Sequence, residues 1–188
     1  MKKLMLTIAA ALLVVAASAQ NKFYVGGSLG YSSSAYDGGT QKSVLTFLPE
    51  FGYILNDNMA VGVELGYTSN NHKASDRVSG EFQFAPYFRY TFLSLGNVSL
   101  FGDAGFSYKR ESEKVGSSDN KAITNAFGVA VQPGLAYSLN EKFSLVAKFG
   151  NLLGFSSAKA DAEGAKATTN FNLLNLSNNL TFGFYYNF

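Results

Sequence analysis

Five charged residues stand at similar sequence distances from short segments rich in Asn, Asp and Gly. They are Glu50, Glu64, Arg89, Asp103 and Lys148. Glu50 lies seven residues before Asp57, and Glu64 lies seven residues after it. Arg89 and Asp103 flank a second such segment at the same spacing. If the flanking stretches are tilted strands, seven residues climb roughly 18 Å, which places the five groups near one level.

If the strands close into a narrow barrel, five charged side chains at one height inside it can either pair and fill the lumen or line a path for ions. Two carboxylates that face each other across a hairpin, as expected for Glu50 and Glu64, repel unless one is protonated or a cation lies between them. Arg89 and Lys148 are the candidate cations. The set predicts a paired network that fills the lumen, with a narrow ion path as the alternative. A small barrel favours the network because it leaves little room for water.

Two patterns could support hydrolysis, and neither is complete. The segment 26–30 matches G-x-S-x-G, but that chemistry needs a strand-to-helix elbow with His and acid partners, and here the segment reads as a strand. His72 is the only histidine and lies near Ser69 and Ser75 in a hydrophilic stretch. A lone histidine cannot make a zinc site, which needs three or four ligands. We expect no enzymatic activity and no cofactor, with a lipid-modifying enzyme as a second alternative.

The stretches that carry these residues alternate between large apolar and small or polar side chains. This period of two is typical of strands with two different faces. It predicts eight strands, over residues 22–33, 43–55, 58–70, 80–94, 97–110, 122–139, 142–156 and 169–188. The charged residues above all fall on the small and polar face, which we expect to point inward.

The connections between the predicted strands alternate in length. Three are tight turns rich in Asn, Asp and Gly, and four are longer and hydrophilic, at 34–42, 71–79, 111–121 and 157–168. Short turns at one end and long loops at the other are typical of a membrane-spanning barrel. Three prolines fall inside strands, at positions 49, 86 and 133, where we expect local bulges because proline lacks a ladder donor.

The first 19 residues have the three-part layout of a cleaved secretory signal peptide. Lys2 and Lys3 precede an uncharged apolar run, and Ala17 and Ala19 form the small-x-small site before Gln20. The run is too short to span a bilayer as a helix. We therefore expect two parts, a signal peptide at 1–19 and a barrel domain at 20–188. Without the signal, the remaining chain has 13 basic and 13 acidic residues.

Composition narrows the class further. The chain has 17 Phe, 11 Tyr and 19 Gly but no Trp and no Cys, so it has no disulfide. Its mean hydropathy of +0.04 suits a membrane barrel, in which only alternate residues face lipid. The formally neutral mature chain shows no clustered basic face, so no nucleic-acid partner is expected. A soluble barrel with the apolar face inward is the rival fold, but its outer face would be too poor in charge.

The segment 49–62, a strand, a turn and a strand, resembles the signature of the outer-membrane β-barrel domain (porin-family) proteins. The C-terminal segment 180–188 resembles the β-signal of that family, in which Phe182, Phe184, Tyr186 and Phe188 alternate up to the last residue. The resemblance covers about 20–188. It implies an outer-membrane location and reading of the C-terminal signal by the barrel-assembly machinery. It does not supply a biochemical activity.

Taken together, these features predict an all-β, eight-stranded, antiparallel up-and-down transmembrane β-barrel. We expect a monomer in outer-membrane lipid, with a side-chain-filled lumen and a structural role or contacts with external molecules through four loops. The alternative is a narrow porin-like channel for ions or small solutes.

Overall fold

The computed structural model describes residues 22–35, 41–72, 77–115, 121–176 and 180–188, which form ten antiparallel strands. The predicted signal peptide, with Ala17, Ala19 and Gln20, lies outside the described residues. The strands are β1 (Phe23–Ala35), β2 (Gln41–Asn56), β3 (Met59–His72), β4 (Arg77–Leu95), β5 (Val98–Val115), β6 (Lys121–Ser138), β7 (Phe143–Lys148), β8 (Asn151–Ala160), β9 (Thr168–Asn175) and β10 (Thr181–Asn187). The described part of the chain contains no helix that could cross a membrane.

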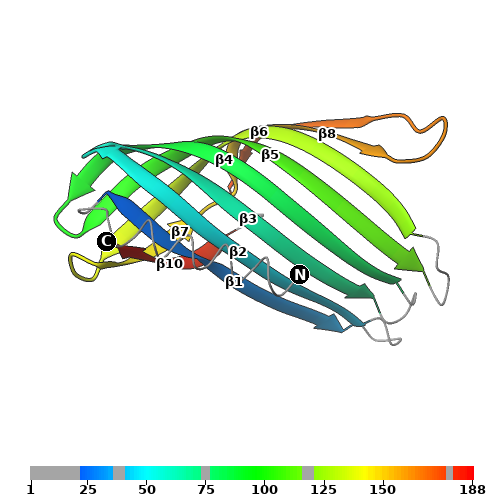
Figure 1. The fold of residues 1–188 in the computed structure, drawn as a ribbon, viewed down its shortest axis with the longest axis horizontal. Coiled ribbons are helices and arrows are strands. Elements are labelled where there is room, and N and C mark those ends of the chain that lie inside the picture. Colours follow the sequence, from blue (N-terminus) through cyan, green and yellow to red (C-terminus); the bar gives the residue numbers. More distant parts are fainter. Residues whose placement is uncertain (1–21, 36–40, 73–76, 116–120, 177–179) are drawn as a thin grey trace.

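Eight of the strands close a ring. The strands β1 to β7 pair in sequence order, β7 also pairs with β10, and β10 pairs with β1. The strands are strongly tilted and wrap around a common axis (Figure 1). The predicted eight-stranded antiparallel barrel is therefore confirmed, with strand ends within a few residues of those expected.

The last two predicted strands are each divided, which corrects the expectation of continuous strands at 142–156 and 169–188. The seventh is split into β7 and β8 at Phe149 and Gly150, and the eighth into β9 and β10. β6 pairs with both β7 and β8, but the partner strand carries two extra residues at the break. There the backbone N–H of Phe149 donates to the carbonyl of Pro133 at 3.0 Å. Pro133, which has no backbone N–H to donate, thus lies opposite the break.

The two faces of the strands point in the predicted directions, the apolar face outward and the small or polar face inward. Large apolar side chains lie on the outside of the ring and remain exposed, as at Phe84, Phe88, Val129, Leu145 and Phe184. An exposed apolar band of this kind suits lipid and not water. It excludes the soluble barrel, in which the same face would be buried.

The predicted bulges at the three prolines were largely wrong. The pairing register continues unchanged past Pro49 and Pro86, and only the neighbouring strand of Pro133 is interrupted. The register shifts between β2 and β3 and between β4 and β5 lie near the tight turns, at Ile54/Asn56 and Thr91/Leu93. A strand can accept a proline by losing one hydrogen bond, without inserting a residue.

The tight turns are held by asparagine side chains and one glycine. The Asn56 side chain accepts a hydrogen bond from the Asn58 N–H at 3.0 Å, and Asn140 accepts from the Lys142 and Phe143 N–H groups at 2.9 Å. Gly96 adopts a φ of 59°, a left-handed conformation that glycine takes at no steric cost. These short turns fix the registers that set the height of each inward side chain.

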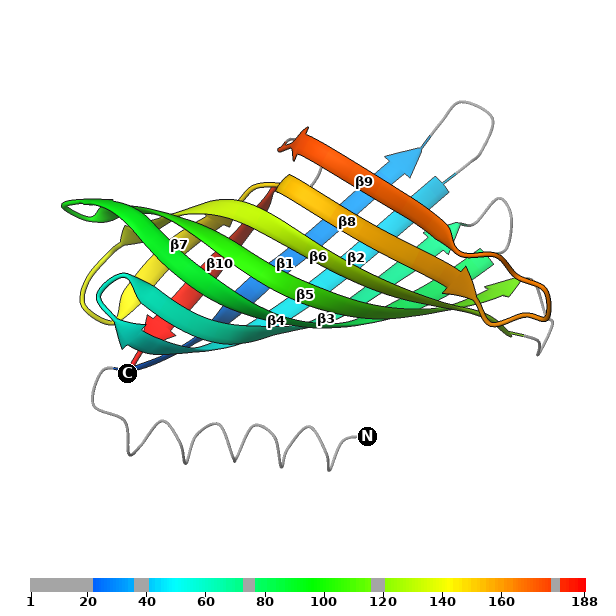
Figure 2. The same ribbon diagram turned by 90° about the horizontal axis from the view of Figure 1, so that it is seen from above.

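The ring is closed at the end with the tight turns and open along part of its other half. The pairing of β1 with β10 ends at Ser28 and Gly183. Among the described residues, β9 pairs only with β8, and β1 beyond Ser28 pairs only with β2. Figure 1 shows the β8–β9 hairpin on the opposite side of the molecule from β1, and Figure 2 shows the same hairpin from above. The wall therefore has a side opening between β1 and β9.

Candidate functional site

The five charged residues singled out from the sequence meet inside the closed half of the barrel. Glu50 on β2 pairs directly with Glu64 on β3, and Arg89 on β4 pairs directly with Asp103 on β5. Lys148, the last residue of β7, reaches the same level from the other side of the ring. Because the inward face of each strand is set by the tight turns, residues distant in sequence converge at one height. We call Glu50, Arg89, Asp103, Lys148 and Tyr185 the waist network.

Arg89 is held by a two-point contact with Asp103. Its Nε and one terminal nitrogen donate to the two Asp103 carboxylate oxygens, each at 2.7 Å. The terminal nitrogen also donates to Glu50 at 3.2 Å and to the Tyr185 hydroxyl at 3.0 Å. All four side chains are buried. This planar, bidentate geometry suits arginine and not lysine.

Glu50 accepts hydrogen bonds from four sides. Its donors are the Lys148 amine at 2.7 Å, the Tyr185 hydroxyl at 2.7 Å, Arg89, and the Tyr87 hydroxyl. Tyr87 is in turn hydrogen-bonded to the Tyr24 hydroxyl. A buried carboxylate with this many donors has its charge compensated and its lone pairs satisfied.

Lys148 separates the carboxylates that would otherwise repel each other. Its amine lies 2.7 Å from Glu50 and 3.5 Å from both Glu64 and Asp103. Glu64 gains a second donor, the Gln83 amide, at 2.8 Å. The predicted cation between Glu50 and Glu64 is thus present in the structure, and it is Lys148.

Four inward aromatic rings pack around the charged groups, and each lies directly across from a glycine. The pairs are Tyr24 with Gly52, Tyr87 with Gly62, Phe101 with Gly134, and Tyr185 with Gly26. A side chain at any of these glycines would overlap the facing ring. These four aromatics were not among the site residues predicted from the sequence. The signal was available, because an aromatic on the small and polar face needs a small residue opposite it.

The rings also enclose the guanidinium of Arg89. Its central carbon lies 3.9 Å from the centre of the Phe101 ring and 5.2 Å from those of Tyr87 and Tyr185. Phe101 is only 1% exposed. A cation in contact with ring faces away from water gains an additional attraction. The waist is therefore filled by side chains.

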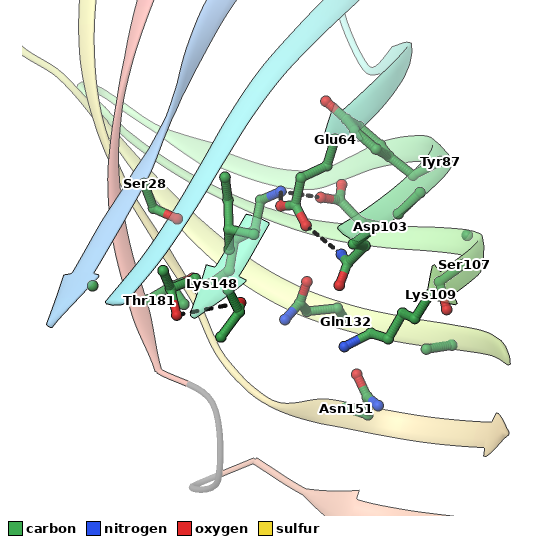
Figure 3. Close-up of a pocket in the computed structure, with 18 of the residues that line it drawn as sticks. Ser28, Glu64, Tyr87, Asp103, Ser107, Lys109, Gln132, Lys148, Asn151 and Thr181 are labelled. Carbon is green, nitrogen blue, oxygen red and sulfur yellow. Dashed lines mark hydrogen bonds and ion pairs between the residues drawn. The ribbon is translucent and has the colours of Figure 1, made fainter. Parts of the chain in front are cut away.

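Beyond the waist, toward the loop end, the lumen is hollow, which corrects the expectation of a filled interior. A cavity of about 1000 Å³ lies there, and Glu64, Asp103 and Lys148 border it. Figure 3 shows these three residues together, with Lys109 and Asn151 around the same space. Small inward residues leave this volume empty, among them Ser28, Gly30, Ala85, Gly105 and Ala130.

The other sequence candidates lie outside the waist network. Gln132 donates to the Phe149 carbonyl at 2.6 Å, at the break between β7 and β8. Ser28 lies on a strand and borders the cavity, so the G-x-S-x-G segment has no elbow. His72 ends β3, paired with Lys42 and Arg77, and Ser75 lies outside the described residues. The described residues contain no group of three or more side chains suited to a metal ion.

The C-terminal residues form the seam that closes the ring. β10 pairs with β7 on one side and β1 on the other, and the Phe188 N–H donates to the Phe23 carbonyl at 3.0 Å. The Phe143 ring lies 5.2 Å from the rings of Phe184 and Tyr186. Phe182 and Phe184 are exposed on the outer face.

Solved structures with this fold are outer-membrane barrels. Neisserial surface protein A (NspA) matches with a TM-score of 0.53 and 16% identity over 88% of this chain and 97% of its own. OprG from Pseudomonas aeruginosa gives 0.53 and 17% over 89% and 96%. Outer membrane protein W from E. coli gives 0.52 and 15% over 91% and 100%. At these identities the likeness shows the fold alone. A search of curated protein sequences found no match.

The sequence itself matches one family over nearly its full length. The match covers residues 4–188, so it includes every strand described above. It agrees with the apolar outer band, the closed ring and the fold of the solved structures, and it places the protein in the outer membrane. The chain belongs to the family described as the outer membrane protein beta-barrel domain.

Proposed function

We propose that this protein is a non-conducting outer-membrane barrel that meets external molecules through its loop end. The waist network carries the proposal. Buried ion pairs and aromatic rings from β1, β2, β4, β5, β7 and β10 fill the closed half of the ring. A through path for ions would require these paired groups to separate, leaving buried charges without partners. The hollow half, by contrast, is available to ligands from the loop end.

Planar-bilayer recording tests the proposal directly. The refolded mature chain is expected to show no steady single-channel conductance. Arg89→Ala should give leak or irregular steps, because it removes the cation that holds Asp103 and Glu50 together. Arg77→Ala, in an exposed ion pair with Glu113, is the matched control and should stay silent. Stable, ion-selective steps in the wild type would overturn the proposal and make a narrow channel the leading function.

We further propose that the protein acts without catalysis and that its C-terminus is read by the assembly machinery. The absence of an elbow at Ser28 argues against the hydrolase motif, because the nucleophile would lie on a straight strand. A hydrolysis assay on phospholipid and lipid A substrates checks this point. Release of fatty acid that is lost in Ser28→Ala would contradict it.

Phe188→Ser is expected to lower the amount of folded protein in the outer membrane several-fold. Phe188 lies at the seam where β10 joins β1, and its ring packs edge-on against Tyr186 at 4.8 Å. The measurement is the folded fraction in isolated outer membranes. Phe171→Ser, at an exposed position on β9, is the control and should accumulate almost normally. Equal loss in both variants would show that general apolarity matters and not the C-terminal signal.

A further inference from the structure

The side opening between β1 and β9 begins where the pairing of β1 with β10 stops, and this end of it is apolar. Leu29 on β1 is 76% exposed and Phe182 on β10 is 68% exposed, whereas Phe84 and Phe88 on the closed wall are 42% and 40% exposed. Leu29 pairs with Phe47 on β2, and Phe182 pairs with Ala147 on β7. In the described part of the chain neither pairs with a strand on its other side, which leaves both more exposed. The end of the opening beside the β1–β10 pairing is therefore suited to contact with lipid chains.

The opening lies at the height of the apolar band. Phe155 on β8 pairs with Phe171 on β9, and Leu153 pairs with Leu173, and all four are exposed on the outer face. Open sheet edges are not tolerated in hydrocarbon, because unpaired backbone N–H and C=O groups have no partner there. Lipid chains alone therefore cannot fill the opening. Its occupant must bring polar atoms to the edges or admit water from the lumen.

The lumen cavity reaches the end of the side opening that adjoins the β1–β10 pairing. The lining of the 1000 Å³ cavity includes Leu29, Leu180 and Phe182 at this end of the opening as well as Glu64 and Gln132 in the interior. In Figure 3, Ser28 and Thr181 lie on the strands at one side of this space, and Lys109 lies across from them. The volume is at the upper end of the range for small-molecule sites, which is about 300–1000 Å³.

The charged groups that line the cavity leave one negative charge unbalanced. Three are carboxylates (Glu64, Glu81 and Asp103) and two are amines (Lys109 and Lys148). Lys109 pairs with Glu81 at 3.0 Å, and Lys148 makes its shortest contact with Glu50, behind the cavity. Glu64 keeps only a longer contact of 3.5 Å with Lys148 and the Gln83 amide. It is the carboxylate that a cationic ligand would complete.

We propose that this space binds a single-chain amphiphile whose head group carries an amine. The head group lies at Glu64 in the cavity, and the chain leaves between Leu29 and Phe182 into the outer leaflet. The head group pairs with Glu64, water from the hollow lumen reaches the unpaired backbone groups of the strand edges, and the chain contacts the apolar side chains at the end of the opening. This inference deepens the proposed function and rests on it, because the filled waist is what makes the cavity a dead end and not a passage.

Fluorescence quenching tests the proposal because the chain contains no tryptophan. Phe182→Trp places a reporter at the opening, and Phe84→Trp places one on the closed wall. Both variants are refolded in phosphatidylcholine vesicles and titrated with two probes, an alkylamine and a fatty acid of equal chain length, each with a nitroxide at the same carbon. Quenching of the closed-wall reporter measures partition into the bilayer and normalises the curves.

The quantity compared is the mole fraction of probe that quenches half of the fluorescence of the reporter at the opening, after normalisation. It is expected to be about fivefold lower for the amine than for the fatty acid, because one ion pair with Glu64 contributes about this factor in affinity. Glu64→Gln, which keeps the size and hydrogen-bonding of the side chain, should remove the difference. Equal quenching of the two reporters, or shielding of the opening reporter from both probes by strand pairing or a second copy, would overturn the inference. A silent bilayer recording with equal quenching would leave the proposed function intact, whereas a conducting wild type would overturn that function.

Discussion

Arg89→Ala is expected to lower the free energy of unfolding by about 3–5 kcal/mol, the cost of removing one partner from a buried ion pair. Asp103 would lose both of its 2.7 Å donors and keep only the 3.5 Å contact with Lys148. The aromatic rings around the guanidinium would also line a void. Equilibrium unfolding by urea in phospholipid vesicles, followed by far-UV circular dichroism, gives the value.

Two further variants separate the buried geometry from charge alone. Arg77→Ala removes an arginine from an ion pair whose side chains are 53% and 35% exposed, and should cost no more than about 1 kcal/mol. Arg89→Lys keeps the charge but loses the two-point contact, so it should fall between the two. If Arg89→Ala and Arg77→Ala are equally mild, the waist network does not stabilise the barrel.

The position of the waist network could be predicted from the sequence because two simple rules determine it. Alternation tells which residues point inward, and the tight turns fix how far each lies along its strand. Counting seven residues from a turn therefore placed Glu50 opposite Glu64 and Arg89 opposite Asp103, as the pairing shows. The sequence left both Arg89 and Lys148 as candidates for the cation between Glu50 and Glu64, since the choice between them depends on the curvature of the whole ring.

The break in the seventh strand could not be read from the alternation. Val131 on β6 pairs with Leu153, and Gly134 pairs with Lys148. Three steps along β6 thus correspond to five steps along the partner chain, which is two residues more than a regular ladder needs. An insertion of two residues leaves the period of two in phase, so Phe143 and Phe155 still share a face. The pattern that reveals strands therefore conceals an interruption of this length.

The hollow half of the lumen was missed for a related reason. An eight-stranded barrel is expected to be filled by its own side chains. That expectation holds at the waist, where tyrosine and phenylalanine rings cover facing glycines. Above it the inward residues are small, and the divided strands leave the wall unpaired at β9. Whether the lumen is filled at a given height depends on the size of the inward residues there, and the number of strands does not give that size.

After Arg89, Gly27 is the second position at which a substitution is expected to lower the free energy of unfolding strongly, because β1 approaches a proline closely there. Gly27 pairs with Pro49 on β2 and has a φ of +146°, a conformation essentially restricted to glycine. A Cβ there would overlap the Leu48 carbonyl oxygen and lie 2.8 Å from the Cα of Pro49. Both are backbone atoms, so neither can rotate away. The unbroken register at this proline thus depends on a glycine across from it.

Gly27→Ala is therefore expected to destabilise the barrel by about 3 kcal/mol, from overpacking together with backbone strain. Gly30→Ala, three residues further along β1, is the matched control. Its Cβ would meet only Thr46, at an ordinary 3.6 Å, so its unfolding free energy should change by less than about 1 kcal/mol. The same urea titration in vesicles measures both. Equal stability of the two variants would mean that β1 can shift away from Pro49, and the continuous register would then need another cause.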